Sequence, residues 1–325
     1  MVASCYTTDI SMLSNTTKGY ILAAIAAASY GTNPLFALPL YKIGMNPESV
    51  LFFRYMTAIP MLAAMLMMRG RGFGLRRHQI LPLVAMGLIM AISSLTLFES
   101  YNHMAAGIAS TLLFVYPIMV AVIMALFFKE RLTITTILCI VMALSGIGLL
   151  YRGSDGDTLS LVGTLLVMAS SLSYAIYIVG ANRPMLSEIP TLKITFYVLV
   201  FGAVIFAGRF ATGTPFTMPA ASQWYMWADV VALALFPTAI SFLCTTVAIQ
   251  RIGSTPTAIL GALEPVTAIF FGVLVFGETL TPRDMVGLTL IIVAVTMVVG
   301  GSKTGEYLMR LRRMFPRILN RVRHK

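Results

Sequence analysis

The sequence predicts an all-α membrane protein with ten transmembrane helices in two inverted five-helix repeats, and three observations lead to this prediction. Hydrophobic residues make up 58% of the 325 residues and charged residues only 11%, whereas a soluble globular chain carries about 25% charged residues. The apolar residues form long runs, and a hydrocarbon core about 30 Å thick takes about 20 apolar residues per helix. Parts of the second half of the chain also repeat parts of the first half.

Ten apolar segments are long enough to cross a membrane. They cover residues 19–40, 49–68, 80–101, 104–128, 133–151, 160–180, 192–210, 227–249, 254–276 and 285–301. Lys193 and Arg209 stand at the ends of the seventh segment, where long side chains can reach the lipid headgroups. The segments do not alternate in polarity as the strands of a membrane barrel do. We therefore expect helices, because a helix satisfies its own backbone groups in lipid.

The regions outside these spans carry few signals. Residues 1–18 form a polar tail without the basic start and apolar core of a cleaved signal peptide. The two repeats are expected over residues 19–151 and 160–301, followed by a basic amphipathic tail over residues 302–325. Cys5, Cys139 and Cys244 lie too far apart for a metal site or a disulfide framework. We expect no metal and no cofactor.

Lysine and arginine residues are distributed unequally between the two sides of the expected membrane. If the N-terminus is cytoplasmic, the inner segments before residue 302 hold ten of them, the tail holds eight more, and the outer segments hold four. Cytoplasmic loops carry the excess of positive charge in membrane proteins. We therefore expect a multi-pass protein of the bacterial inner membrane with both termini in the cytoplasm.

The tail accounts for most of the net charge of +11, which argues against a nucleic-acid-binding surface. Its apolar residues recur at helical spacing between arginines, as in segments that lie on anionic lipid. A disordered tail that only fixes the topology is the alternative. The expected partners are a small-molecule substrate and the lipid bilayer, without nucleic acid, and the oligomeric state stays open between monomer and dimer.

The internal repeat keeps its register over several motifs. At an offset of 148 residues, matches occur at Ala91-Ile92-Ser93 with Ala239-Ile240-Ser241, Pro117 with Pro265, Glu130 with Glu278, and Leu132-Thr133 with Leu280-Thr281. Ser29-Tyr30 matches Ser173-Tyr174 at an offset of 144. Because each half has five spans, the second half enters the membrane from the opposite side. Inverted repeats are typical of secondary transporters, whose sites lie near the bilayer midplane where the halves meet.

Several motifs stand out in both halves of the chain. In the second half they are residues 248–255, Leu263-Glu264-Pro265-Val266 and Gly277-Glu278-Thr279-Leu280-Thr281. In the first half they are Gly107-Ile108-Ala109-Ser110, Tyr116-Pro117, Lys129-Glu130-Arg131-Leu132, and Phe53-Arg54-Tyr55 followed by Ala58. Through these motifs the sequence resembles the EamA-type drug/metabolite transporters over residues 19–301. The resemblance implies a ten-helix basket around a central cavity. It also implies a transporter, since members mostly export amino acids, related metabolites or toxic compounds, and some import.

The leading hypothesis is thus a secondary transporter of a small metabolite, most simply an exporter of amino acids or related compounds by alternating access, with proton coupling as an option. A passive facilitator or uptake carrier of the same fold is an alternative, and a membrane-embedded lipid-headgroup enzyme or flippase-like protein is a further one. The chain has no phosphate-binding loop of the Walker type and no hydrolase motif. We therefore expect neither an ATP-driven pump nor an enzyme, and no catalytic residue.

Two carboxylates fall inside the expected spans, and we interpret them differently. Glu264 is near the centre of the ninth span, where a charged carboxylate costs about 2.5–3.5 kcal/mol, so a functional, inward-facing residue is expected. Its neighbour Pro265 frees a backbone carbonyl on the preceding turn. Packing of Glu264 against neighbouring hydroxyls is the structural alternative. Glu99 lies near the outer end of the third span, where an interfacial carboxylate needs no functional explanation, although a role in the site stays open.

The remaining candidates are polar groups within the spans. Arg54 could attract an anionic group or pair with a carboxylate, but its long stem also permits snorkelling. Tyr30, Asn33, Tyr116 and Tyr174 are expected to line one space between the halves, and Pro34 is expected to break the first span. Tyr177 and Ser241 complete the set. Tyrosines with a few convergent polar groups suit a modest organic ligand, although tyrosine is also common at membrane interfaces.

Overall fold

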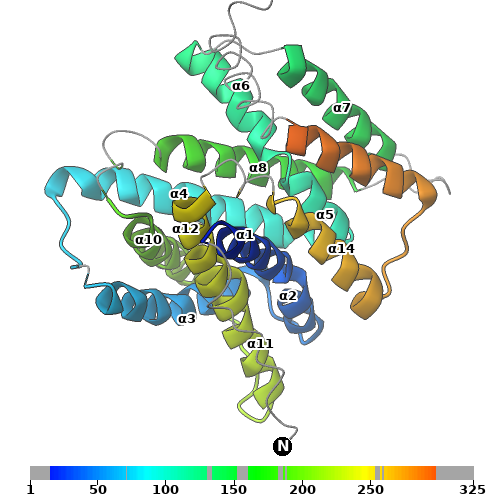
Figure 1. Cartoon of the computed structure of the whole chain (residues 1–325). Helices are drawn as coiled ribbons and strands as arrows, with labels where there is room; N and C mark the ends of the chain where they lie inside the picture. The colour runs from blue at the N-terminus through cyan, green and yellow to red at the C-terminus, as the bar shows by residue number, and fades with distance from the viewer. Residues whose placement is uncertain are drawn as a thin grey trace, which may run out of the picture.

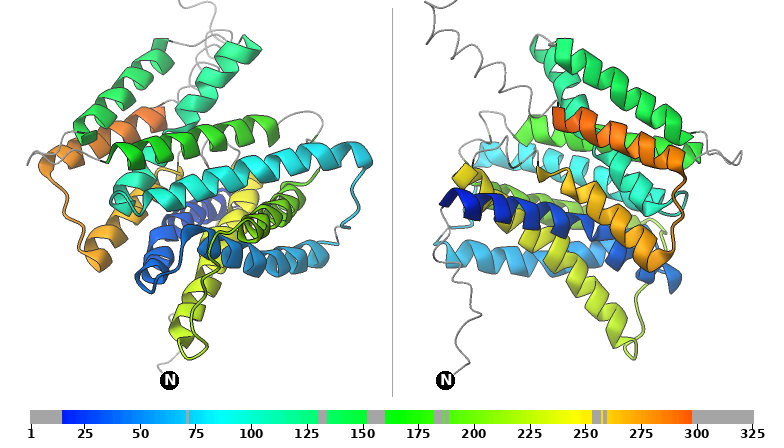
Figure 2. Two further views of the ribbon diagram at one scale, coloured as in Figure 1. Left: turned by 180° about the vertical axis from the view of Figure 1, so that it is seen from behind. Right: turned by 45° about the vertical axis from the view of Figure 1, so that its right-hand side comes forward.

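The structure is a computed structural model that describes residues 15–70, 72–129, 134–151, 160–181, 186, 189–252, 257 and 260–297. This part of the chain is helical and contains no β-strand (Figures 1 and 2). In the first half the helices are α1 (Asn15–Gly31), α2 (Asn33–Lys42), α3 (Pro47–Met68), α4 (Arg77–Ser100), α5 (Ala106–Leu113), α6 (Tyr116–Phe128) and α7 (Ile134–Tyr151). In the second half they are α8 (Leu161–Ala181), α10 (Thr191–Ala211), α11 (Trp224–Ala234), the π-helical segment η2 (Leu235–Ile240), α12 (Ser241–Ile252), α14 (Leu263–Phe276) and a helix over residues 282–297.

Within these residues, seven helical segments are long and apolar enough to cross a membrane. They are Asn15–Lys42, Pro47–Met68, Arg77–Ser100, Ala106–Phe128, Leu161–Gly180, Thr191–Ala211 and Trp224–Thr245, which correspond to the expected spans one to four and six to eight. The fifth and ninth expected spans contain shorter apolar helices, Ile137–Leu149 and Leu263–Phe276. The tenth is helical as far as residue 297. The all-helical membrane fold is confirmed, and the basic tail lies outside the described residues.

Several spans are interrupted next to a proline. The first span breaks at Thr32, between α1 and α2, with Pro34 in the first turn of α2, as the sequence predicted. The fourth span breaks between α5 and α6, directly before Tyr116-Pro117. The eighth is π-helical around Pro237. Proline lacks an N–H and displaces the preceding turn, so these breaks follow from the sequence.

The position of Glu264 in the ninth span differs from the one expected from the sequence. We expected Glu264 in the interior of a continuous helix, but it lies in the first turn of α14, directly after a turn at Gly261 and Ala262. Pro265 explains the difference, because proline is tolerated in the first turn of a helix and disfavoured in its interior.

Corresponding helices of the two halves form corresponding contacts. The most extensive packing joins α4 to α8 and α1 to α12, which lie side by side in Figures 1 and 2. In the first pair the Ser93 hydroxyl donates to the Ser170 carbonyl at 3.1 Å. In the second pair the Ser241 hydroxyl donates to the Ala26 carbonyl at 2.9 Å. These donors are 148 residues apart and the acceptors 144 residues apart, which are the offsets of the sequence repeat.

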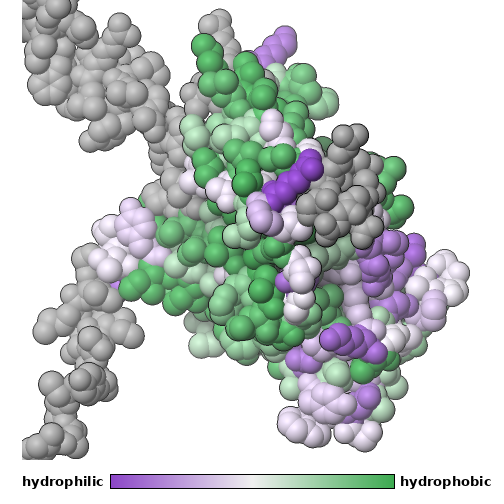
Figure 3. Space-filling view, turned by 90° about the vertical axis from the view of Figure 1, so that its right-hand side faces the viewer, coloured by the Kyte–Doolittle hydropathy of each residue, from purple (hydrophilic) through white to green (hydrophobic). Residues whose placement is uncertain are grey.

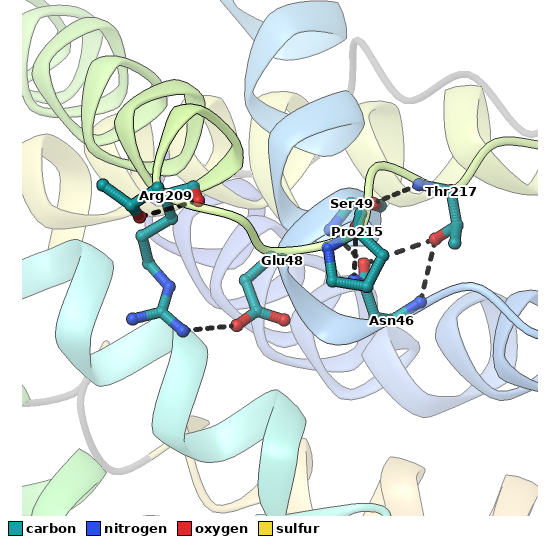
Figure 4. Close-up of polar contacts among 7 residues, drawn as sticks. Asn46, Glu48, Ser49, Arg209, Pro215 and Thr217 are labelled. Atoms are coloured by element: carbon teal, nitrogen blue, oxygen red, sulfur yellow. Dashed lines mark hydrogen bonds and ion pairs between the residues drawn. The ribbon is translucent and has the colours of Figure 1, made fainter.

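A polar cluster ties α3 to the end of α10 and the loop that follows it (Figure 4). The Asn46 side chain caps α3 by accepting from the Ser49 N–H at 2.9 Å, and it donates to the Pro215 carbonyl at 2.7 Å. Nearby, the Arg209 guanidinium forms an ion pair with Glu48 at 3.0 Å. The two halves are therefore joined by polar contacts here as well as by helix packing.

The outer surface is strongly apolar. Leu126, Phe127, Leu138, Val204 and Leu274 are among the large hydrophobic side chains with more than half of their surface exposed. Figure 3 shows extensive hydrophobic areas on one face, with hydrophilic residues gathered toward one edge. A soluble monomer rarely exposes such patches, whereas a lipid-facing surface requires them.

The residues that follow α6 and α14 both have a left-handed backbone conformation, which allows a test of the repeat. Lys129 follows α6 with a φ of 57°, and Gly277 follows α14 with a φ of 67°; they are 148 residues apart. A side chain in this conformation costs about 1–2 kcal/mol. Gly277→Ala should therefore lower the stability of the protein by about 1 kcal/mol, whereas Lys129→Gly should raise it slightly. Thermal unfolding of the purified protein in detergent measures the stability of both variants. Equal shifts in the same direction would contradict the left-handed conformation of these two residues.

Candidate functional site

Glu264 lies where α14 meets the broken first span. A β-carbon added to Gly31, the last residue of α1, would overlap the Glu264 carbonyl oxygen and lie 2.7 Å from the Thr267 β-carbon. The missing side chain of Gly31 therefore allows the two backbones to approach closely. Glu264 itself is half-buried, and no ion pair joins it to another described residue.

Four tyrosines lie near Glu264. Tyr30 on α1, Tyr101 after α4, Tyr116 on α6 and Tyr174 on α8 are all close enough to interact electrostatically with its carboxyl group. The rings of Tyr116 and Tyr174 form an edge-to-face contact with centroids 4.7 Å apart, a favourable geometry for aromatic pairs. The Tyr177 ring stacks on Tyr174 at 6.0 Å. We call Glu264 with Tyr30, Tyr101, Tyr116, Tyr174 and Tyr177 the tyrosine cluster.

The tyrosine cluster is formed by side chains of both halves, and most of these side chains are partly exposed. Tyr30, Tyr116, Tyr174 and Tyr177 are half-buried, like Glu264, although the rings of the last three contact one another. Aromatic rings with polar tips, together with one carboxyl group, are suited to a small organic ligand.

Arg54 on α3 lies beside this cluster. Only 6% of its surface is exposed, so the snorkelling alternative is wrong. Its Nε donates to the Thr238 hydroxyl on η2 at 3.1 Å, and the guanidinium stands over the Phe98 ring at 5.6 Å. It also interacts electrostatically with Tyr30. Arg54 points inward because α3 turns this face toward α4 and η2.

Three other candidates have different surroundings. The buried Asn33 amide donates to the Tyr30 carbonyl at 2.9 Å, and its Oδ1 has no hydrogen-bond partner among the described residues. The Ser241 hydroxyl is used in the contact with α1. Glu99 has 38% of its side chain exposed and lies 3.6 Å from His103. Asn33 thus borders the cluster through Tyr30, while the geometry of Ser241 and Glu99 fits helix packing and an interfacial pair.

Sequence reasoning missed several neighbours of the site. Tyr55 is fully buried and bonds Ser94 at 2.7 Å; its position next to Arg54 was the available signal. Thr238 follows Pro237, and only the π-helical turn directs it toward Arg54. π-Helical turns occur frequently at functional sites, but their positions are difficult to infer from one sequence.

Glu278 links the end of α14 to the start of α5. Its carboxylate accepts from the N–H groups of Ala106 at 2.8 Å and Gly107 at 3.3 Å. A carboxylate at a helix N-terminus is favourable. Gly272 leaves the necessary space, since a β-carbon there would lie 2.8 Å from the Glu278 carboxyl carbon. The repeated glutamate therefore joins the two halves, and its counterpart Glu130 lies outside the described residues.

Comparison with known proteins identifies the family. The model of the EamA-like transporter family matches the chain twice, over residues 17–152 and 161–300. The chain belongs to the EamA-like transporter family. This confirms the resemblance seen in the sequence, and it shows a multi-pass membrane protein built from two repeats.

Individual relatives agree with this assignment. The Bacillus subtilis protein described as the uncharacterized transporter YcbK is 23% identical over 277 residues, which are 83% of this chain and 88% of that protein. The threonine/homoserine exporter RhtA of Escherichia coli K12 is 26% identical over 219 residues, 67% of this chain and 70% of RhtA. A protein crystal structure with 18% identity superposes with a TM-score of 0.62 and covers 87% of this chain and 96% of that one. The last comparison supports the fold alone.

The groups at the site suit an organic ligand. In the described part of the chain, no group of three or more His, Cys, Asp or Glu residues could hold a metal ion. The tyrosine cluster offers a carboxyl group and phenolic hydroxyls, and Arg54 beside it adds a guanidinium. These groups can bind an organic solute reversibly.

Proposed function

We propose that this EamA-like protein is a secondary transporter that exports a small metabolite, an amino acid or a related compound, across the bacterial inner membrane. The observation that carries the proposal is the tyrosine cluster, in which Glu264 and tyrosines of both halves meet at the junction of α1, α6, α8 and α14. A site between two repeats is where rocking of one half against the other exposes a ligand to each side in turn. The similarity to a threonine/homoserine exporter supports the substrate class and the direction.

The proposal includes ten spans in two inverted halves, with both termini in the cytoplasm. The repeat offsets and the corresponding contacts of Ser93 and Ser241 support it. We further propose that Glu264 carries the proton that couples export to the pH gradient. The basic tail over residues 302–325 would lie on anionic lipid, and no nucleic acid would take part.

A passive facilitator or uptake carrier is the second candidate function. It would share the fold and the site but would need no intramembrane carboxylate. An enzyme acting on lipid headgroups is less well supported, because such an enzyme would gather polar residues at one interface. The charged and phenolic groups described above come together between the helices of both halves instead.

A metabolite screen tests the proposed function. Cells that overproduce the protein and cells with an empty vector are compared for intracellular and extracellular small molecules. We expect at least one compound to move from the inner to the outer pool when the protein is present. Unchanged pools would contradict export, and an increase of the inner pool would favour uptake.

The proposed topology gives a separate prediction. Reporter fusions after Lys325 and within residues 69–77 should read cytoplasmic, and a fusion near Ala221 should read external. The reason is the excess of lysine and arginine on the cytoplasmic side. An external reading at Lys325 would contradict the inverted repeat, because two halves of five spans place both termini on one side.

A further inference from the structure

Among the described residues, Arg54 is a buried cation without an ion-pair partner. Only 6% of its surface is exposed, yet no carboxylate in the described residues lies within ion-pair distance of it. Its hydrogen bonds go to neutral side chains, because Nε donates to the Thr238 hydroxyl and the guanidinium also bonds the Tyr30 side chain. Charged side chains within a membrane protein are expensive unless they are paired, and they commonly mark a substrate or ion pathway.

The surroundings of Arg54 fix its position without neutralising its charge. The Phe98 ring lies beneath the guanidinium, and cation–π contact holds such a group in place. Nε donates to the hydroxyl of Thr238, which belongs to the second half of the chain. Thr238 and Tyr30 use two of the five guanidinium N–H groups. The remaining N–H groups on the terminal nitrogens can bind a carboxylate.

Arg54 borders the candidate site through Tyr30. Tyr30 bonds the Arg54 side chain and interacts electrostatically with Glu264. The half-buried rings of Tyr116 and Tyr174 continue the same cluster. A small molecule beside these rings would therefore meet the guanidinium at one end of the site.

We propose that Arg54 binds a carboxylate of the transported metabolite, so that the substrates are organic acids that include α-amino acids. This inference rests on the proposed function and narrows it. It assigns anion recognition to Arg54 and leaves Glu264 for the proton. Organic amines and neutral compounds without a carboxylate are then excluded as principal substrates, because binding them would leave the guanidinium unpaired in the closed site.

The test extends the metabolite screen to variants of the full chain. Cells producing the wild-type protein, Arg54→Gln, Arg54→Lys or Arg209→Gln are compared at matched membrane levels. Arg209 is a suitable control because it is a half-exposed arginine whose partner, Glu48, lies outside the site. We expect the wild-type exported pool to consist of carboxylates and Arg54→Gln to reduce their export about tenfold to hundredfold. Arg54→Lys should keep part of the export, and Arg209→Gln should match the wild type.

A measurement on the wild-type protein avoids any problem of folding in the variants. In proteoliposomes, uptake of the labelled exported metabolite is measured in the presence of an unlabelled competitor. The competitors are the same metabolite, its carboxamide, and the analogue in which hydrogen replaces the carboxylate. We expect competition by the carboxylate only. Equal competition by the carboxamide, an exported compound without a carboxylate, or wild-type export by Arg54→Gln would each overturn the inference and leave the proposed function standing. If the wild-type protein exports nothing, the proposed function fails and the inference fails with it.

Discussion

Glu264→Gln is expected to abolish transport driven by a pH gradient while substrate exchange continues. The amide keeps the shape of the carboxyl group and its place among the tyrosines but can neither take up nor release a proton. If Glu264 carries the coupled proton, the gradient can no longer drive the conformational cycle. Exchange of substrate for substrate needs no net proton movement, so it should continue at a rate close to that of the wild type.

Proteoliposomes that contain the purified protein and the exported metabolite separate these two activities. Net transport is measured with an imposed pH gradient, and exchange is measured without a gradient by using labelled substrate on one side. Glu99→Gln is the matched control, since Glu99 has 38% of its side chain exposed and lies beside His103 rather than in the tyrosine cluster. This control should retain both activities.

The other outcomes of the Glu264→Gln experiment have distinct meanings. A parallel loss of exchange and net transport would show that Glu264 binds the substrate itself, for example through an amine. Normal gradient-driven transport would show that Glu264 only stabilises the packing of α14. Either result would remove the proton-coupling part of the proposed function.

The sequence predicted the features that depend on local chemistry. The break of the first span could be predicted from Asn33-Pro34, because proline geometry acts wherever the residue occurs. Glu264 was expected inside a continuous helix and lies instead in the first turn of α14. The repeat placed Tyr30 and Tyr174 at equivalent positions, and both interact electrostatically with Glu264 in the structure.

The direction of individual side chains required the three-dimensional structure. Arg54 was compatible with snorkelling because its distance from the end of the span was the only information available. In the structure, the neighbouring helices decide which face of α3 is buried, and they place Thr238 and Phe98 around the guanidinium. Tyr101 was missed for the same reason, because it follows α4 in a turn and only the packing brings it near Glu264.

Gly31→Ala is expected to reduce both the stability of the protein and its rate of transport. The added β-carbon would overlap the Glu264 carbonyl oxygen and lie 2.7 Å from the Thr267 β-carbon. A backbone oxygen cannot rotate away as a side chain can, so α1 and α14 must move apart. Overpacking of this kind costs about 1–3 kcal/mol. The separation would also displace Tyr30 and Glu264, which lie next to the contact in sequence and in space.

Gly208→Ala provides the control for Gly31→Ala. Gly208 lies in α10, and a β-carbon there would meet no other atom within 4 Å. Because alanine favours a helix by about 1 kcal/mol over glycine, Gly208→Ala should be neutral or slightly stabilising. Thermal unfolding in detergent and initial rates in proteoliposomes compare the two variants. A Gly31→Ala protein with unchanged stability and rate would mean that α1 and α14 do not touch at Gly31 during the cycle.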